Sequence, residues 1–276
     1  MLRSILIGLD GSPYSQSAIE LGIDWARRFK ILLVGLGIVD EPAICRPELV
    51  PLGADSFKQH SDEVRLARAS HQVEQFLEQF RQQCTKAGVT SKVLKEVGDP
   101  TEQILREAQR YDLILLGQQT HFHFATQQEP CETLKKVLKN TPRPVVTVPI
   151  QRTGGTAVVI AFDGSLQAAR ALQAFQWLRL DGAKIHVVSV GADSTEVTRC
   201  ADRAVEFLGL HELQATVHAV VSSAAPAQVL LDHLRGLNAN LAVMGAYGKP
   251  GIREFFLGSV TRTLLQESPV PLFLYH

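Results

Sequence analysis

The sequence contains an internal repeat, and this repeat restricts the possible folds more than any other feature. The segment Ile7–Ser12 (IGLDGS) returns as Ile160–Ser165 (IAFDGS), in both places an apolar run that ends in Asp-Gly-Ser. A second segment, Asp112–Gly117 (DLILLG), returns as Asn240–Gly245 (NLAVMG), an apolar run that ends in glycine. Matching segments in the same order indicate two tandem copies of one domain.

The two copies also end alike, since Thr141–Val146 (TPRPVV) matches Ser268–Phe273 (SPVPLF). Between them lies Gln151–Gly155 (QRTGG), whose polar, glycine-rich composition is typical of a linker. We therefore expect one domain over residues 1–150, called the first copy, and one over residues 155–276, called the second copy.

Each copy alternates short apolar runs with amphipathic stretches, which is typical of an α/β fold with helices on both faces of a parallel sheet. In the first copy the pattern predicts strands near 4–9, 31–38, 91–97, 113–117 and 145–149, and helices near 14–29, 62–87, 101–109 and 132–139. In the second copy it predicts strands near 157–162, 184–190, 214–221, 241–245 and 272–275, and helices near 167–178, 194–208, 227–234 and 259–267. Right-handed crossovers then favour two tandem, doubly wound, five-stranded sheets.

The second copy contains the stretch LAVMGAYGKPGIREFFLGSVT, which places glycines where the chain leaves a buried strand. Gly245 ends the apolar run, Gly248 follows it, and Gly258 and Ser259 open the next predicted helix. Glycines let backbone N–H groups approach a ligand, and a helix N-terminus adds unpaired donors and a positive dipole end. The arrangement suits a phosphate chain, and the alternative is an ordinary turn. The hydroxyls of Ser259 and Thr261 can cap the helix or donate to phosphate oxygens.

The spacing Gly245-x2-Gly248-x9-Gly258-Ser259 resembles the nucleotide-binding motif of the universal stress protein family, in its ATP-binding, UspA-like branch. The resemblance covers nearly the whole chain and is specific in the second copy only. It implies a Rossmann-like fold of the adenine nucleotide alpha hydrolase type, with strand order 3-2-1-4-5. That order would bring the ends of the first and fourth strands together at the topological switch point, where such sheets bind ligands.

The resemblance also implies that the second copy binds ATP, with Mg²⁺ held by the phosphates and water because no protein-only metal cage is evident. In family members the aspartate after the first strand contacts adenosine, which would give this role to Asp163, whereas the simpler alternative is a turn residue. No catalytic residue and no protein ligand for a metal is assigned. The expected binding residues are Ala161, Asp163, Val190, Met244, Gly245, Gly248, Gly258, Ser259, Val260 and Thr261.

The first copy has lost most of this motif. Gly117 is retained, but Thr120 stands at the second glycine position, Cys131 at the third and Glu132 at the serine. A carboxylate at the helix start would repel a polyphosphate. We interpret Asp10 as a turn residue, although the first copy could still admit an adenosine-like fragment. The sequence therefore predicts one ATP per chain, in the second copy.

Three functions remain open. The leading one is an ATP-binding regulator of the stress response, in which nucleotide occupancy changes a surface that binds an unidentified protein partner. The others are a slow ATPase or autophosphorylating enzyme that uses the same site, and a nucleotide-free interaction module. Whether the chain is an enzyme stays unresolved, because the motif supplies phosphate donors but no residue at a fixed distance to activate a nucleophile.

Composition restricts the partners. Basic and acidic side chains number 28 each and no basic run occurs, which argues against nucleic acid. Without a targeting segment or an apolar run of membrane-spanning length, we expect a cytoplasmic protein with no membrane partner. The last strands, near 145–149 and 272–275, would be exposed sheet edges unless they pair. We therefore predict an intramolecular pseudo-dimer of the two copies, with further dimerisation left open.

His121 and His123 offer a possible metal pair, which Glu129 or Cys131 could complete, but isolated loop histidines usually face solvent. The sequence fixes no third ligand, so we do not assign a metal site.

Three cations, Lys249, Arg253 and Arg262, lie in or next to the glycine motif and could either neutralise phosphates or be solvated. The first copy also carries an insertion over residues 41–60, rich in Pro, Gly and polar residues, which we expect to be an exposed loop.

Overall fold

The computed structural model describes residues 2–47, 55–122, 132–178, 180, 182–246 and 258–276. The chain divides into two compact units, an N-terminal unit over residues 3–137 and a C-terminal unit over residues 138–276 together with Leu2. The boundary between the units therefore falls before the last strand of the first copy.

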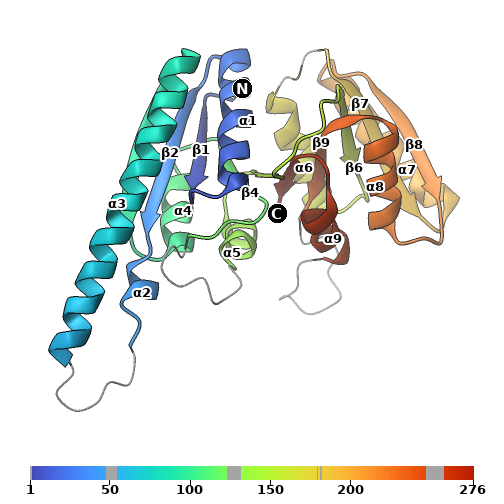
Figure 1. Ribbon diagram of the computed structural model, residues 1–276. Helices are drawn as coiled ribbons and strands as arrows, with labels where there is room; N and C mark the ends of the chain where they lie inside the picture. The colour runs from blue at the N-terminus through green and yellow to red at the C-terminus, as the bar shows by residue number, and fades with distance from the viewer. Residues whose placement is uncertain (1, 48–54, 123–131, 179, 181, 247–257) are drawn as a thin grey trace. The chain divides into compact units, whose positions relative to one another are not determined.

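The N-terminal unit contains a parallel sheet in the order β3-β2-β1-β4, with helices packed against it (Figure 1). Its strands are β1 (Ser4–Leu9), β2 (Leu32–Val39), β3 (Ser91–Val97) and β4 (Leu113–Gly117). Its helices are α1 (Pro13–Phe29), α2 (Glu41–Ile44), α3 (Asp55–Ala87) and α4 (Pro100–Ala108), and α5 (Thr133–Asn140) runs across the unit boundary.

The C-terminal unit contains the complete sheet of the second copy, whose parallel strands follow the order β8-β7-β6-β9-β10. This is the expected order 3-2-1-4-5. The strands are β6 (Ala157–Ala161), β7 (Lys184–Gly191), β8 (Ala215–Val221), β9 (Ala239–Gly245) and β10 (Leu272–Tyr275). The helices are α6 (Leu166–Phe175), the 3-10 turn η1 (Gln176–Leu178), α7 (Ser194–Leu210), α8 (Pro226–Gly236) and α9 (Ser259–Glu267).

The last strand of the first copy, β5 (Val145–Val148), also belongs to the C-terminal unit. It pairs antiparallel with β10, and Val146 lies opposite Phe273. The predicted pairing of the two last strands is therefore confirmed.

Apolar runs become strands here because both faces of each sheet are covered. Ile5, Leu6 and Ile7 are consecutive in β1 and all have 0% of their surface exposed, which requires helices on both sides. In the second copy Phe175 of α6 packs edge-on against Phe273 of β10, with ring centroids 6.5 Å apart. Because the helices cover both faces of each sheet, a site can form in the loops at the carboxyl ends of the strands.

The repeated Asp-Gly-Ser sequence forms the same strand-to-helix turn in both copies. Gly11 and Gly164 have φ angles of 71° and 75°, in the left-handed region that favours glycine. The serine that follows is the N-cap: the Ser12 side chain accepts from the Ser15 N–H and the Ser165 side chain accepts from the Ala168 N–H. The repeat is therefore explained in part by backbone geometry.

Observed and predicted elements agree to within two residues, except at the end of α6, where residues 176–178 form η1, and at the insertion, which is not an open loop throughout. It contains α2 and the start of α3, while residues 48–54 lie outside the described residues. α2 forms because the Asp40 side chain caps it by accepting from the Ala43 N–H at 3.1 Å. α3 begins at Asp55, and an ion pair of 2.8 Å between Lys58 and Asp62 supports its first turns. Figure 1 shows α3 extending past the end of β2, beside α2.

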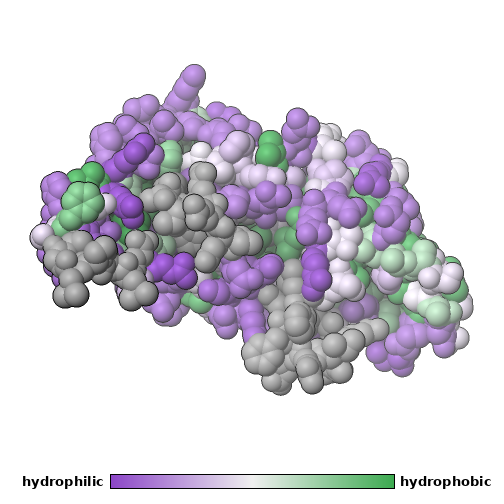
Figure 2. Space-filling view, turned by 60° about the horizontal axis from the view of Figure 1, so that its bottom comes forward, coloured by the Kyte–Doolittle hydropathy of each residue, from purple (hydrophilic) through white to green (hydrophobic). Residues whose placement is uncertain are grey.

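The face drawn in Figure 2 carries mainly hydrophilic side chains, with smaller hydrophobic areas between them. Within the described ranges, none of the helices combines the length and the apolar character that crossing a bilayer requires.

Candidate functional site

A cavity of about 310 Å³ opens at the carboxyl ends of β6, β7 and β9 in the C-terminal unit. The first turns of α6, α8 and α9 complete its walls. Small-molecule sites commonly measure roughly 300–1,000 Å³, so the cavity has room for a nucleoside-sized ligand. It lies at the switch point of the sheet, where β6 and β9 are neighbours and the helices that follow them diverge.

Gly245 and Gly258 have different structural roles, although both belong to the predicted motif. A Cβ at Gly245 would lie 2.6 Å from the backbone carbon of Gln167 and closer still to the nitrogen of Ala168. Gly245 is therefore required for the close approach of α6. Among the described residues, a Cβ at Gly258 would meet nothing nearer than the Thr261 Oγ1 at 3.9 Å. Packing against the described residues does not require glycine at 258, and ligand approach is one reason that would explain it.

The first residues of α9 line this cavity. Gly258 is the N-cap, and no side chain of the described residues makes the capping hydrogen bond. Ser259 is the first helical residue and is exposed, so it does not act as the cap. Thr261 is buried, and Arg262 next to it is exposed. The first N–H groups of α9 are thus available to an anion, and the helix dipole favours one.

Asp163 lies at the carboxyl end of the first strand of the second copy, on the cavity wall and exposed to solvent. Its Oδ1 accepts from the Ser165 N–H at 3.0 Å, which is the turn role that the sequence allowed. Among the described residues this is the one hydrogen bond that the Asp163 carboxylate makes. The same side chain can therefore shape the turn and still accept a hydrogen bond from a ligand hydroxyl or amine.

The remaining wall is apolar. Val188 and Val190 of β7 share one face of the strand, and Leu230 of α8 and Met244 of β9 complete the apolar lining. Behind the wall, Cys200 of α7 approaches Gly164, and burial raises the pKa of its thiol, helped by a hydrogen bond to Glu196. The cavity thus combines an apolar floor with a carboxylate on one side and helix N–H donors on another.

Nine of the ten expected binding residues line this cavity, and the tenth, Gly248, lies outside the described residues. Lys249 and Arg253 also lie outside them. Sequence reasoning missed the α8 wall, since Pro226 and Leu230 come from a segment with no motif. Val188 could have been found, because side chains two residues apart on a strand share a face with Val190.

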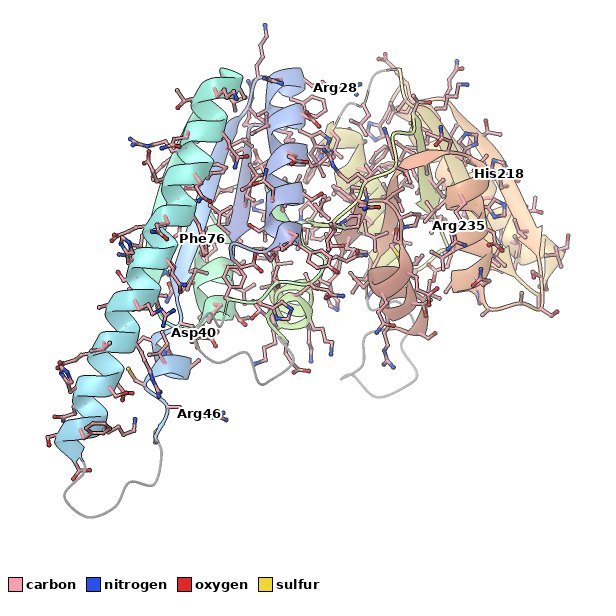
Figure 3. The ribbon with its side chains drawn as sticks, in the orientation of Figure 1. Arg28, Asp40, Arg46, Phe76, His218 and Arg235 are labelled. Carbon is pink, nitrogen blue, oxygen red and sulfur yellow. The ribbon has the colours of Figure 1, made fainter. Side chains whose placement is uncertain are left out.

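The equivalent place in the first copy is arranged differently. Asp10 is buried, and its Oδ2 accepts from the backbone N–H of His121 at 2.6 Å. Phe122 is fully buried, and a Cβ added at Gly11 would overlap the ring of Phe76 on α3, which Figure 3 labels. Among the described residues no group of three or more His, Cys, Asp and Glu side chains could hold a metal ion. The other residues considered for a metal site with His121, namely His123, Glu129 and Cys131, lie outside the described residues.

These features define a class of protein: tandem, doubly wound α/β domains with a cavity at the switch point of the second sheet. The sequence profile of the Universal stress protein family matches residues 1–149 and, a second time, residues 156–276. This chain therefore belongs to the universal stress protein family.

Relatives of similar length exist in several organisms. The universal stress protein Slr1230 of Synechocystis sp. (strain ATCC 27184 / PCC 6803 / Kazusa) is 24% identical over 288 residues, covering 99% of this chain and 100% of that protein. The universal stress protein Rv1996 of Mycobacterium tuberculosis (strain ATCC 25618 / H37Rv) is 22% identical over 304 residues, covering 98% and 94%. Among solved structures, that of a universal stress protein from Archaeoglobus fulgidus DSM 4304 matches with a TM-score of 0.72 at 22% identity, covering 99% and 97%. The last similarity shows a shared fold.

Proposed function

We propose that this protein binds one ATP per chain in the cavity of the second copy, and that ATP occupancy regulates its binding to a protein partner during the stress response. The observation that carries the proposal is that one cavity is lined by Asp163, by apolar side chains and by the first residues of α9. Membership of the universal stress protein family supports the same reading.

Each part of the cavity suits one part of ATP. The apolar wall, which includes Val190 and Met244, suits the faces of an adenine ring. The carboxylate of Asp163 suits the ribose hydroxyls or the adenine amine as donors. The N–H groups at the start of α9, with the Ser259 hydroxyl, suit phosphate oxygens. Mg²⁺ would join the phosphates to water, since this cation keeps several waters and favours phosphate oxygens.

The direct test is titration calorimetry with Mg-ATP, together with mass spectrometry of any small molecule retained by the purified protein. We expect binding by the wild type, and loss of binding in Gly258→Val and Gly248→Val with the fold preserved. Full-strength ATP binding by both variants would remove the basis for this assignment.

The stoichiometry is a second readout. Equilibrium dialysis at saturating Mg-ATP should give one equivalent per full-length chain, because in the first copy Glu132 stands before the start of α5, where the second copy has Ser259. Two equivalents would show that the first copy can also hold a polyphosphate. If ATP occupancy regulates partner binding, a protein partner should bind the wild type and Gly258→Val with different affinities when Mg-ATP is present. Equal affinities would count against this regulation.

A further inference from the structure

The walls of the second-copy cavity have counterparts in the first copy, which the sheet registers identify. The equivalent pairs, with the first-copy residue named first, are Gly8 and Ala161, Ile38 and Val190, and Gly117 and Gly245. Each second-copy residue lines the cavity and is partly exposed, whereas each first-copy residue is buried. In the first copy, protein atoms therefore cover the place where the second copy has a cavity.

The side chain of Leu116 and the ring of Phe122 together cover Gly8. Phe122 has 0% of its surface exposed, and its Cζ lies 3.0 Å from the position that a Cβ at Gly8 would take. Carbon atoms need roughly 3.5–4.0 Å between them, so even an alanine at Gly8 would force both the ring and the Leu116 side chain, whose Cδ2 would lie 2.5 Å from the new Cβ, to move. Gly8 and Phe122 therefore fit each other, whereas the equivalent Ala161 has a Cβ and faces open space.

The residue before this ring satisfies the carboxylate of the first copy. The Oδ2 of Asp10 accepts from the His121 N–H, while its Oδ1 accepts from the backbone and hydroxyl of Ser12 at 3.0 and 2.6 Å. Both oxygens of Asp10 are therefore engaged, and the side chain is buried with 5% of its surface exposed. Asp163, the equivalent residue, is exposed, and in the described ranges of the chain one of its oxygens is engaged.

We propose that His121 and Phe122 occupy in the first copy the place that a nucleoside takes in the second, with the Phe122 ring at the base position and the His121 N–H on the carboxylate. This makes Phe122 the specificity-determining residue that excludes adenosine from the first copy. The inference rests on the proposed function for the identity of the ligand. It also differs from the expectation that the first copy could admit an adenosine-like fragment, because in this inference the chain itself fills that place.

Removal of the ring tests this inference in the full-length chain, with adenosine as the probe and equilibrium dialysis as the measurement. An apolar hole left by a deleted aromatic side chain can accept a small aromatic molecule. We expect the wild type to bind one adenosine and Phe122→Ala to bind two. ATP binding should stay at one equivalent, because Glu132 still stands before α5.

The matched control is Phe80→Ala. Phe80 is also fully buried in the N-terminal unit, but it packs from α3 against Gly35 rather than beside Asp10. Both variants leave a hole of the same chemistry, but the hole at Phe80 lies against Gly35. Phe80→Ala should therefore still bind one adenosine. Phe122→Val is measured in parallel in case the alanine variant does not fold. This variant also removes the ring but keeps a branched apolar side chain.

The outcomes separate the two proposals. One adenosine in wild type and still one in folded Phe122→Ala or Phe122→Val overturns the inference and leaves the proposed function standing. No adenosine or ATP in wild type but one adenosine in Phe122→Ala overturns the proposed function, and supports only the exclusion of adenosine from the first copy by Phe122. A second adenosine in both Phe122→Ala and Phe80→Ala shows unspecific filling of holes, and also overturns the inference.

Discussion

Gly258 offers a test in which stability and ligand affinity should move in opposite directions. It is the N-cap of α9, with φ of −52° and ψ of 145°, a conformation open to any residue. In the part of the chain that the structure describes, a Cβ there meets nothing nearer than 3.9 Å. Aspartate and serine are both preferred over glycine at N-caps by a few tenths of a kcal/mol, and a carboxylate gains about 0.3–1 kcal/mol from the helix dipole. Gly258→Asp and Gly258→Ser should therefore unfold at or slightly above the wild-type temperature.

The two variants should differ in ATP affinity, because only aspartate adds a negative charge. Two unit charges ~4 Å apart interact by about 4 kcal/mol at the effective dielectric of a protein surface. Salt, water and Mg²⁺ screen much of this, but ~1.4 kcal/mol is already tenfold in Kd. We therefore expect Gly258→Asp to bind Mg-ATP at least about tenfold more weakly than Gly258→Ser.

Calorimetry with Mg-ATP and with adenosine measures the difference, and thermal unfolding controls for the fold. Adenosine carries no phosphate, so both variants should bind it alike. If Gly258→Asp binds ATP as tightly as Gly258→Ser, the phosphates do not lie at the N-terminus of α9. If adenosine affinity falls in parallel with ATP affinity, the loss does not come from charge.

Three further predictions concern stability. Gly245→Ala should lower the free energy of unfolding by about 1–3 kcal/mol, because its Cβ would overlap the backbone of α6 at Ala168; an unchanged thermal midpoint would contradict the packing role of Gly245. Ser165→Ala should lower it by about 1 kcal/mol through loss of the α6 cap, and Ser165→Asn should restore it; equal midpoints for both would show that the cap is not needed. The Nδ1 of His186 lies 2.9 Å from the Nε2 of His218, labelled in Figure 3, and burial lowers the pKa of both below the ordinary 6.5. Below about pH 6.5 the unfolded chain therefore binds protons that the folded chain does not, so the free energy of unfolding should fall as the pH is lowered. In thermal melts at pH 7.5 and 5.5, His218→Gln should lose less stability between the two pH values than the wild type. An equal loss in both proteins would contradict this prediction.

Much of this arrangement could be predicted from the sequence, because it depends on local pattern. Strands such as Leu113–Gly117 are short apolar runs with clear ends, and glycines and Ser259 mark where the chain turns into a helix. The start of α3 was missed because its first turns are polar and stabilised by side-chain pairs such as Lys58 with Asp62, which leave no apolar period.

The filled first copy was missed for a different reason. Phe122 lies between histidines in a polar stretch, which gives no sign that its ring is buried. Its position depends on the absence of a side chain at Gly8, more than a hundred residues earlier in the chain. Such a long-range fit between a small and a large residue is invisible to local pattern. The same holds for Leu230, which reaches the second-copy cavity from a helix without a motif.

The position of β5 has a consequence for the two halves of the chain as separate molecules. Cleavage at the linker would leave β5 at the end of an N-terminal fragment and β10 in a C-terminal fragment, although the two strands are hydrogen-bonded partners. Each fragment would then expose an apolar strand with unpaired N–H and C=O groups, the kind of edge that promotes aggregation. The sequence contains two copies of one domain, but neither copy satisfies all of its strand hydrogen bonds alone. Each copy supplies the strand that pairs with the last strand of the other.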